Sequence, residues 1–136
     1  MVIKYERVKK SQYRNRLTER NDCGVITLAL VCRTNYEQAH RWLQEQGRKS
    51  RKSTYVSAMI KAVEDNGFKV VTLDNLKQTN GSKYTPKTIG ARLRRGYYIC
   101  YSQGHIFAVI NGIVEDWTNA RNHRIIRAYQ VIRPRG

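Results

Sequence analysis

The chain has 136 residues, with 26 Lys and Arg against 10 Asp and Glu, so its formal net charge is +16. This length predicts a single domain over residues 1–136. Two Pro and nine Gly exclude a linker or low-complexity protein, and the apolar stretch 25–32 is shorter than the roughly 20 residues of a membrane helix. The first ten residues, MVIKYERVKK, contain no apolar segment typical of a signal peptide, which predicts a cytoplasmic protein.

Helical patterns dominate the first half of the chain. Residues 2–8 alternate weakly between apolar and polar types and predict a short edge strand, and the polar residues 9–20 predict an irregular segment. A buried apolar helix is expected over 23–32, because the Asn21-Asp22 pair before it is suited to helix N-capping. Further helices are predicted over 35–46, after the capping box Thr34-Asn-Tyr-Glu37, and over 54–66, before Gly67.

Strand patterns dominate the second half. A strand is predicted over 68–73, and a polar loop over 74–84 leads to a short helix that begins at Thr85-Pro86 and carries Ile89 and Leu93. Asn111-Gly112 between two apolar runs predicts a tight hairpin turn. Helices followed by an antiparallel sheet define an α+β domain. The strands of this sheet are expected over 97–102, 106–110, 113–117 and 125–132.

Basic side chains are distributed along the whole sequence rather than gathered in one tail. Such a charge attracts nucleic acid, acidic protein or phosphate-bearing ligands, although a basic surface can also serve solubility alone. The sequence contains no zinc finger, basic zipper or RNA-binding aromatic motif that would select among these partners. The clusters are residues 1–20, the segment GRKSRK at 47–52, Arg92 with Arg94 and Arg95, and residues 121–136.

The cysteines occur singly. Cys23, Cys32 and Cys100 are an odd number at wide spacing, and none forms a CxxC pair, so neither a zinc site nor a disulfide framework is expected. Cys32, within the apolar helix, and Cys100, within a strand, are interpreted as core thiols. No metal or cofactor is predicted.

Cys23 differs because it begins the predicted apolar helix. Backbone N–H groups and the positive end of the helix dipole stabilise a thiolate there, and the same N–H groups can bind a developing oxyanion. Gly24 beside it leaves the approach of a substrate carbonyl unobstructed. His105 and Asp116 flank the Asn111-Gly112 hairpin, so Asp116 can orient the imidazole while its other nitrogen faces Cys23. Asn119 is a second candidate for the orienting residue.

These motifs, Cys-Gly at a helix start, Gly-His-Ile-Phe-Ala-Val at a strand start and Asp-Trp at a strand end, resemble small papain-like cysteine peptidases. The resemblance covers about residues 10–118 and is nearest to bacterial double-glycine (bacteriocin-processing) peptidases and stand-alone peptidase-like proteins of bacteria and their phages. It implies a papain-like fold, with Cys23 as nucleophile, His105 as general base and acid, and Asp116 as the orienting residue. The family places an oxyanion-hole Gln about six residues before the Cys. Leu17 stands there in this chain, so either Gln12 or Asn21 takes that part or the oxyanion hole is incomplete.

Two classes of function remain open. One is a cysteine hydrolase acting on a peptide or related acyl bond, with transglutaminase or deamidase chemistry as variants of the same Cys, His and Asp. The other is a non-catalytic protein whose papain-like scaffold and basic surface bind nucleic acid or an acidic host protein. Three further interpretations concern single residues: Trp117 as a wall of the cleft, and His40 and His123 as solvent-facing side chains.

Overall fold

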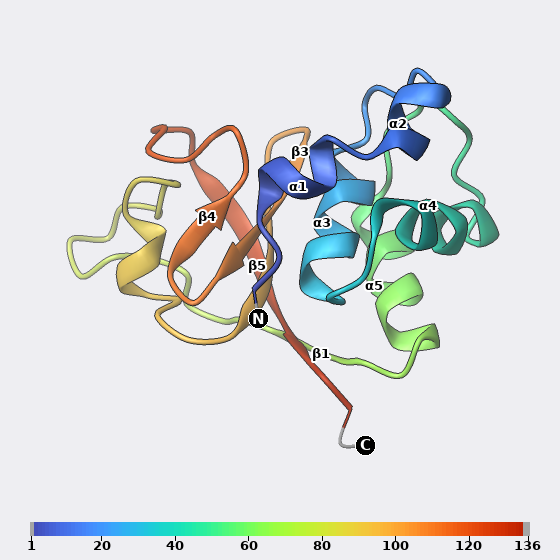
Figure 1. The fold of residues 1–136 in the computed structure, drawn as a ribbon. Helices are drawn as coiled ribbons and strands as arrows, with labels where there is room; N and C mark the ends of the chain where they lie inside the picture. Colours follow the sequence, from blue (N-terminus) through green and yellow to red (C-terminus); the bar gives the residue numbers. More distant parts are fainter. Residues whose placement is uncertain (1, 135–136) are drawn as a thin grey trace.

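Helices and sheet follow one another along the chain much as the sequence predicts (Figure 1). The structure, a computed structural model, describes residues 2–134. Met1, Arg135 and Gly136, which belong to the predicted single domain and its basic ends, lie outside the described residues. The helices are α1 (Tyr5–Lys9), α2 (Gln12–Arg16), α3 (Cys23–Val31), α4 (Tyr36–Glu45) and α5 (Val56–Asp65), with a 3-10 turn η1 (Ile89–Ala91). The strands are β1 (Lys69–Thr72), β2 (Tyr97–Ser102), β3 (His105–Ile110), β4 (Ile113–Glu115) and β5 (Ile125–Ile132).

The five strands form one antiparallel sheet in the order β1-β5-β2-β3-β4. Helices packed against this sheet make the protein an α+β domain, as predicted. The hairpin between β3 and β4 turns at Asn111 and Gly112, whose φ angles are 49° and 84°. Two consecutive positive φ angles match a tight hairpin turn, which explains why the Asn-Gly pair predicted it correctly.

Both faces of the sheet are covered (Figure 1). Helices α1, α3, α4 and α5 lie on one side, and their core includes Ile99, Ala108 and Ile110 from the strands. The segment that contains η1 lies on the other side and packs Ile89 and Leu93 against the opposite face. Because both faces are buried, β2 and β3 are apolar in nearly every position instead of alternating.

Helix α3 lies in the middle of the domain. Every residue from Gly24 to Val31 is buried, which confirms the predicted buried helix. A helix that is apolar on all sides must be surrounded by other elements, and α3 contacts α1, α4, α5 and the sheet. No helix among residues 2–134 is long and apolar enough to cross a membrane.

The N-terminal prediction is wrong. Residues 2–8 contain the start of α1 instead of an edge strand, and the segment 9–20 contains α2 instead of irregular chain. Helix α1 is fixed by distant residues: Tyr5 and Val8 are buried, and the Tyr5 backbone N–H donates to the Glu115 carboxylate at 2.8 Å. The helix predicted from Thr85-Pro86 is reduced to turns and η1.

Candidate active site

Cys23, His105 and Asp116 line one pocket of about 320 Å³, hereafter the site pocket. Cys23 is the first residue of α3, His105 is the first residue of β3, and Asp116 directly follows β4. The Thr27 hydroxyl, one turn along α3 from Cys23, donates to the Ile106 carbonyl at 3.3 Å. This buried hydrogen bond fixes the start of α3 against the start of β3, so the thiol and the imidazole face the same space.

The His105 ring is held on several sides. Its Nε2 lies 2.7 Å from Oδ2 of Asp116, and only 5% of the Asp116 side chain is exposed. The same carboxylate oxygen accepts hydrogen bonds from the backbone N–H and the hydroxyl of Thr118. The imidazole stacks on Phe107 with ring centroids 5.9 Å apart. With Nε2 engaged by Asp116, the second ring nitrogen remains for Cys23.

The protonation of His105 suits a partner of a thiolate. Burial lowers the pKa of His105, but the hydrogen bond with Asp116 and the nearby Cys23 thiol outweigh it and raise the pKa from 6.5 to about 9. His105 is therefore an imidazolium at neutral pH. A positive ring beside a cysteine favours its thiolate form, which is the nucleophilic one. The Cys23 thiol is free and partly accessible.

The residue before Cys23 leaves the helix start open. Asp22 occupies the N-cap position of α3, as predicted, but its side chain makes no capping hydrogen bond. Its carboxylate instead accepts from Arg14 Nε at 2.6 Å, Arg14 Nη2 at 3.3 Å and the Tyr36 hydroxyl at 2.7 Å. Arg14 thus balances the negative charge of Asp22 next to the thiol, and the first N–H groups of α3 are not occupied by an Asp22 cap.

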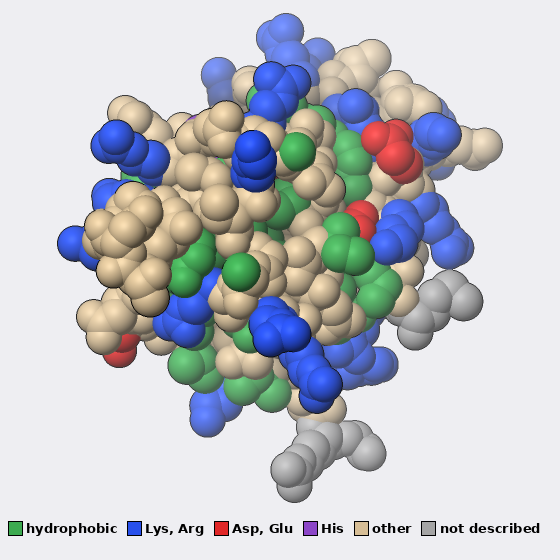
Figure 2. All heavy atoms as spheres, turned by 90° about the vertical axis from the view of Figure 1, so that its left-hand side faces the viewer, with side chains coloured by type: hydrophobic (Ala, Val, Ile, Leu, Met, Phe, Trp, Pro, Cys, Tyr) green, Lys and Arg blue, Asp and Glu red, His purple; other side chains and the backbone are tan. Residues whose placement is uncertain are grey.

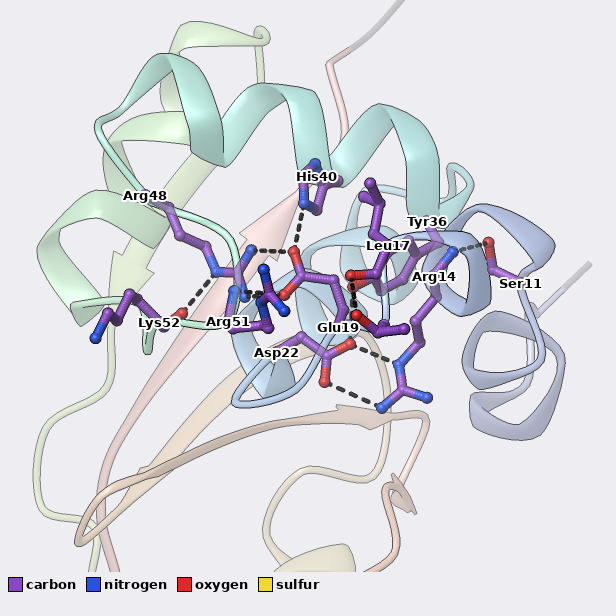
Figure 3. Close-up of polar contacts among 11 residues, drawn as sticks. Ser11, Arg14, Leu17, Glu19, Asp22, Tyr36, His40, Arg48, Arg51 and Lys52 are labelled. Atoms are coloured by element: carbon purple, nitrogen blue, oxygen red, sulfur yellow. Dashed lines mark hydrogen bonds and ion pairs between the residues drawn. The ribbon is translucent and has the colours of Figure 1, made fainter.

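A second polar cluster supports the loop that leads to Cys23 (Figure 3). The Glu19 carboxylate pairs with His40 Nε2 at 2.6 Å and Arg48 Nη1 at 3.0 Å, and it accepts the Arg51 N–H at 2.7 Å. His40 is 1% exposed, so the prediction of a solvent-facing His40 is wrong, and Arg48 of the basic cluster 47–52 is 8% exposed and thus also buried. Burial raises the pKa of Glu19, but its bonds to Arg48, Arg51 and His40 lower it to about 2.

The structure separates the two candidates for the oxyanion hole. Gln12 is exposed on α2 and lines a different pocket, together with Arg33 and Thr34, so it does not reach Cys23. Asn21 does line the site pocket, and its Nδ2 donates to the Arg51 carbonyl at 3.2 Å.

The sequence did not single out two other residues that line the site pocket, Arg14 and Tyr5. Burial and the negative charge of Asp116 raise the pKa of Tyr5 to about 12, so its phenol stays protonated as a donor. Both residues belong to helices that the sequence analysis did not predict. The helical spacing of the buried residues Tyr5 and Val8 was the only signal available for α1.

Gly24 serves packing rather than substrate access. It is buried, and a Cβ built on it would lie 2.8 Å from the Cβ of Thr54. The absence of a side chain therefore lets residues 53–54 approach the start of α3. Ser53 from this segment lines the site pocket, so Gly24 shapes the pocket indirectly.

The structure also places the other cysteines, Asn119 and Trp117. Cys32 and Cys100 are buried as predicted, and burial raises the pKa of both thiols, that of Cys32 to about 12. Asn119 donates to the Val114 carbonyl, so Asp116 and not Asn119 lies against His105. Trp117, 58% exposed, lines the site pocket.

His123 is half-buried rather than solvent-facing, with its ring edge-on to Phe107. Among residues 2–134, no group of three or more His, Cys, Asp or Glu side chains is arranged to hold a metal ion. Comparison with protein-family models, with curated proteins and with solved structures finds no match to this chain.

Proposed function

We propose that this protein is a cysteine hydrolase that cleaves peptide or related acyl bonds through Cys23, His105 and Asp116. The observation that carries the proposal is the shared pocket, in which a helix-start thiol meets an imidazolium held by a buried carboxylate. A nucleophile, a base and a group that orients the base are the three parts that thiol catalysis requires.

The reaction begins with a Cys23 thiolate and a His105 imidazolium. The sulfur attacks the carbonyl carbon, a C–S bond forms, and the carbonyl oxygen takes the negative charge. When this intermediate collapses, the C–N bond breaks and the imidazolium gives its proton to the leaving amine, which leaves a thioester on Cys23. Neutral His105 then takes a proton from water, hydroxide attacks the thioester, and the acid product and the thiolate are released. Asp116 keeps Nε2 protonated throughout.

The oxyanion would be stabilised by backbone N–H groups at the start of α3 and by a side chain from α2. Arg14 is the side chain in the best position, because it lines the site pocket and is fixed by two bonds to Asp22. These bonds use Nε and Nη2, which leaves Nη1 without a hydrogen bond to any residue in 2–134. A donor that is already fixed where the negative charge develops stabilises an oxyanion.

The order of the elements supports a papain-like arrangement for this site. The nucleophile lies on a buried helix from the first half of the chain, the base begins β3 of the sheet behind it, and the orienting residue directly follows the next strand, β4. The Asn111-Gly112 hairpin brings His105 and Asp116 together, and the contacts of α3 with β3 bring Cys23 to both.

The test uses a reactive ester, which requires no knowledge of the natural substrate, and a mixture of peptides. With p-nitrophenyl acetate, intact mass spectrometry should show one acetyl group on Cys23 of the wild type, none on Cys23→Ala, and an unchanged result in the matched control Cys32→Ala. With a mixture of unrelated peptides, new termini that depend on Cys23 indicate hydrolysis. A gain of one mass unit at Gln without cleavage would indicate deamidation instead. Absence of Cys23-dependent acylation, cleavage and deamidation would overturn the proposal.

A further inference from the structure

A groove with only basic charges continues from the site pocket on the His105 side. His105 and Trp117 line both the site pocket and a neighbouring pocket of about 590 Å³. Lys83 and Arg124 line that pocket and also a third one of about 490 Å³, which Lys77 borders. We define the basic groove as these two adjoining pockets. Each has a volume within the usual range of ligand sites, about 300–1000 Å³.

No carboxylate among the described residues lines the basic groove. Lys77, Lys83 and Arg124 are exposed, and none of them belongs to an ion pair between residues of the segment 2–134. Their charges are therefore not neutralised by a neighbouring side chain within the described structure. Lys and Arg also dominate the charged surface on the side that carries residues 74–96, where few acidic side chains are visible (Figure 2).

The groove also offers apolar contacts. Trp117 and Ile126 are 58% and 41% exposed and line the pocket next to the site. Arg121 lies over the Trp117 ring, with its guanidinium carbon 5.7 Å from the ring centroid. A ligand with carboxylates on short aliphatic stems, as in Asp and Glu, would find both apolar walls and positive charges here.

The direction of the groove follows from the chemistry. In the proposed hydrolysis the imidazolium protonates the leaving amine, so the leaving fragment must lie on the His105 side of the thiol. Cys23 borders the site pocket and does not line the groove, whereas His105 borders both the site pocket and the groove. The groove therefore lies where the fragment after the cleaved bond would bind.

From this placement, and resting on the proposed hydrolase function, we infer that the basic groove is a substrate subsite for an acidic peptide segment, held by Lys83 and Arg124 beyond the scissile bond. A peptide fits better than nucleic acid because the groove opens onto the thiol. Only a ligand that presents a carbonyl carbon to Cys23 can occupy the basic groove and react in the site pocket. Charge complementarity of this kind gives selectivity for acidic over neutral sequences.

The test measures binding apart from cleavage. Two fluorescent peptides of equal length, one rich in Glu and one with Gln at the same positions, are titrated by anisotropy into full-length Cys23→Ala, which cannot turn over. At about 50 mM salt, where screening is moderate, the Glu peptide should bind at least about tenfold more tightly. The double change Lys83→Glu with Arg124→Glu should remove this preference. The control double variant, Lys61→Glu with Lys69→Glu, changes the net charge by the same amount, but on α5 and on β1 at the other edge of the sheet. It should keep most of the preference for the Glu peptide.

Several results would overturn the subsite. These are equal affinity for the two peptides, equal weakening by the groove and control variants, and tighter groove-dependent binding of a single-stranded oligonucleotide of the same charge. Cleavage by the wild-type protein separates the two proposals. Cleavage without preference for the Glu peptide supports the hydrolase and contradicts the subsite. Groove-dependent binding of the Glu peptide without cleavage of either peptide supports the subsite and counts against the hydrolase.

Discussion

The protein contains two histidine–carboxylate pairs of nearly equal length, and their surroundings differ. His105 Nε2 lies 2.7 Å from Asp116, the ring side chain is 18% exposed, and the pair borders the site pocket with Cys23. His40 Nε2 lies 2.6 Å from Glu19, but the two side chains are 1% and 0% exposed (Figure 3). Arg48 and the Arg51 backbone N–H occupy the remaining positions on the Glu19 carboxylate.

The comparison shows that a hydrogen-bonded imidazole becomes a candidate catalytic group through access and through what lies at its other nitrogen. The His105 ring borders a pocket that it shares with the Cys23 thiol. The buried Nδ1 of His40 has no hydrogen-bond partner among residues 2–134. The His40 pair instead helps to hold the segment 48–53 and the loop before α3. One pair should therefore affect chemistry, and the other should affect folding stability.

The largest expected difference concerns activity. Cys23→Ala and His105→Ala should each lower hydrolysis by at least about 10³-fold, and the double variant should lose little more, because the two groups act as one unit. His40→Ala should lower the stability of the fold but leave the turnover of the folded fraction within a few-fold. The measurement is turnover per folded molecule, with the folded fraction taken from circular dichroism. If the activity losses of the two single variants multiplied in the double variant, Cys23 and His105 would act independently, which would contradict a shared site.

The next effect concerns stability. Glu19→Gln should lower the free energy of unfolding by about 3 kcal/mol, because it leaves Arg48 as a buried charge without its counter-charge. Glu37→Gln is the matched control. Its partner Arg41 lies 3.4 Å away on an exposed helix face, so the same change there should cost less than about 0.5 kcal/mol. Urea unfolding measures both, and equal losses in the two variants would show that the Glu19 cluster is not structural.

Asp116→Asn should have an intermediate effect. It keeps the nucleophile and the imidazole but removes the charge that raises the pKa of His105 and fixes its orientation. We expect a loss of about 10²-fold in kcat with little change in KM, since Asp116 acts through His105 rather than on the substrate. The pH at which activity falls on the alkaline side should also move down. A loss confined to KM would instead assign Asp116 to substrate binding.

The smallest effects are opposite pH dependences of stability. The folded-state pKa of His105 is raised from 6.5 to about 9, so its contribution is complete below pH 6.5 and is lost as the pH rises through 9. The pKa of Glu19 is lowered from 4.5 to about 2, so its contribution is present above pH 4.5 and is lost as the pH falls through 2. The free energy of unfolding, measured against pH, should vary less than in the wild type at the alkaline end for His105→Gln and at the acidic end for Glu19→Gln. Reduced variation at the same end for both variants would refute the assignment.

The parts of the fold that the sequence predicted correctly depend on local signals. The Asn111-Gly112 turn adopts positive φ angles that those residues tolerate, and α4 begins where the sequence predicts a helix, although Asn35 and not Thr34 of the predicted capping box is its N-cap. The buried helix α3 follows from its unbroken apolar composition. The placement of Cys23, His105 and Asp116 in one pocket could be predicted in part, because the Asn111-Gly112 hairpin brings His105 and Asp116 together from nearby positions in the sequence.

The parts that sequence did not predict depend on distant partners. Helix α1 starts where the Glu115 carboxylate, 110 residues away, accepts the Tyr5 N–H. His40 and Arg48 look like surface residues by type, and their shared partner Glu19, 21 and 29 residues away, makes their burial favourable. Arg14 reaches the site pocket through its bonds to Asp22, and no spacing rule relates those two residues in advance.

The central claim, that His105 activates the Cys23 thiol, is tested most directly by alkylation. Iodoacetamide is added to native protein at pH 6, where an ordinary cysteine, with a pKa of about 8.5, is almost wholly thiol. The rate at each cysteine is followed by peptide mass spectrometry. Native Cys23 should react at least about tenfold faster than the same residue in the urea-unfolded chain, and His105→Ala should abolish this advantage, since the ion pair with the imidazolium maintains the thiolate. A native Cys23 that reacts no faster than in the unfolded chain, or that is indifferent to His105→Ala, would contradict the account.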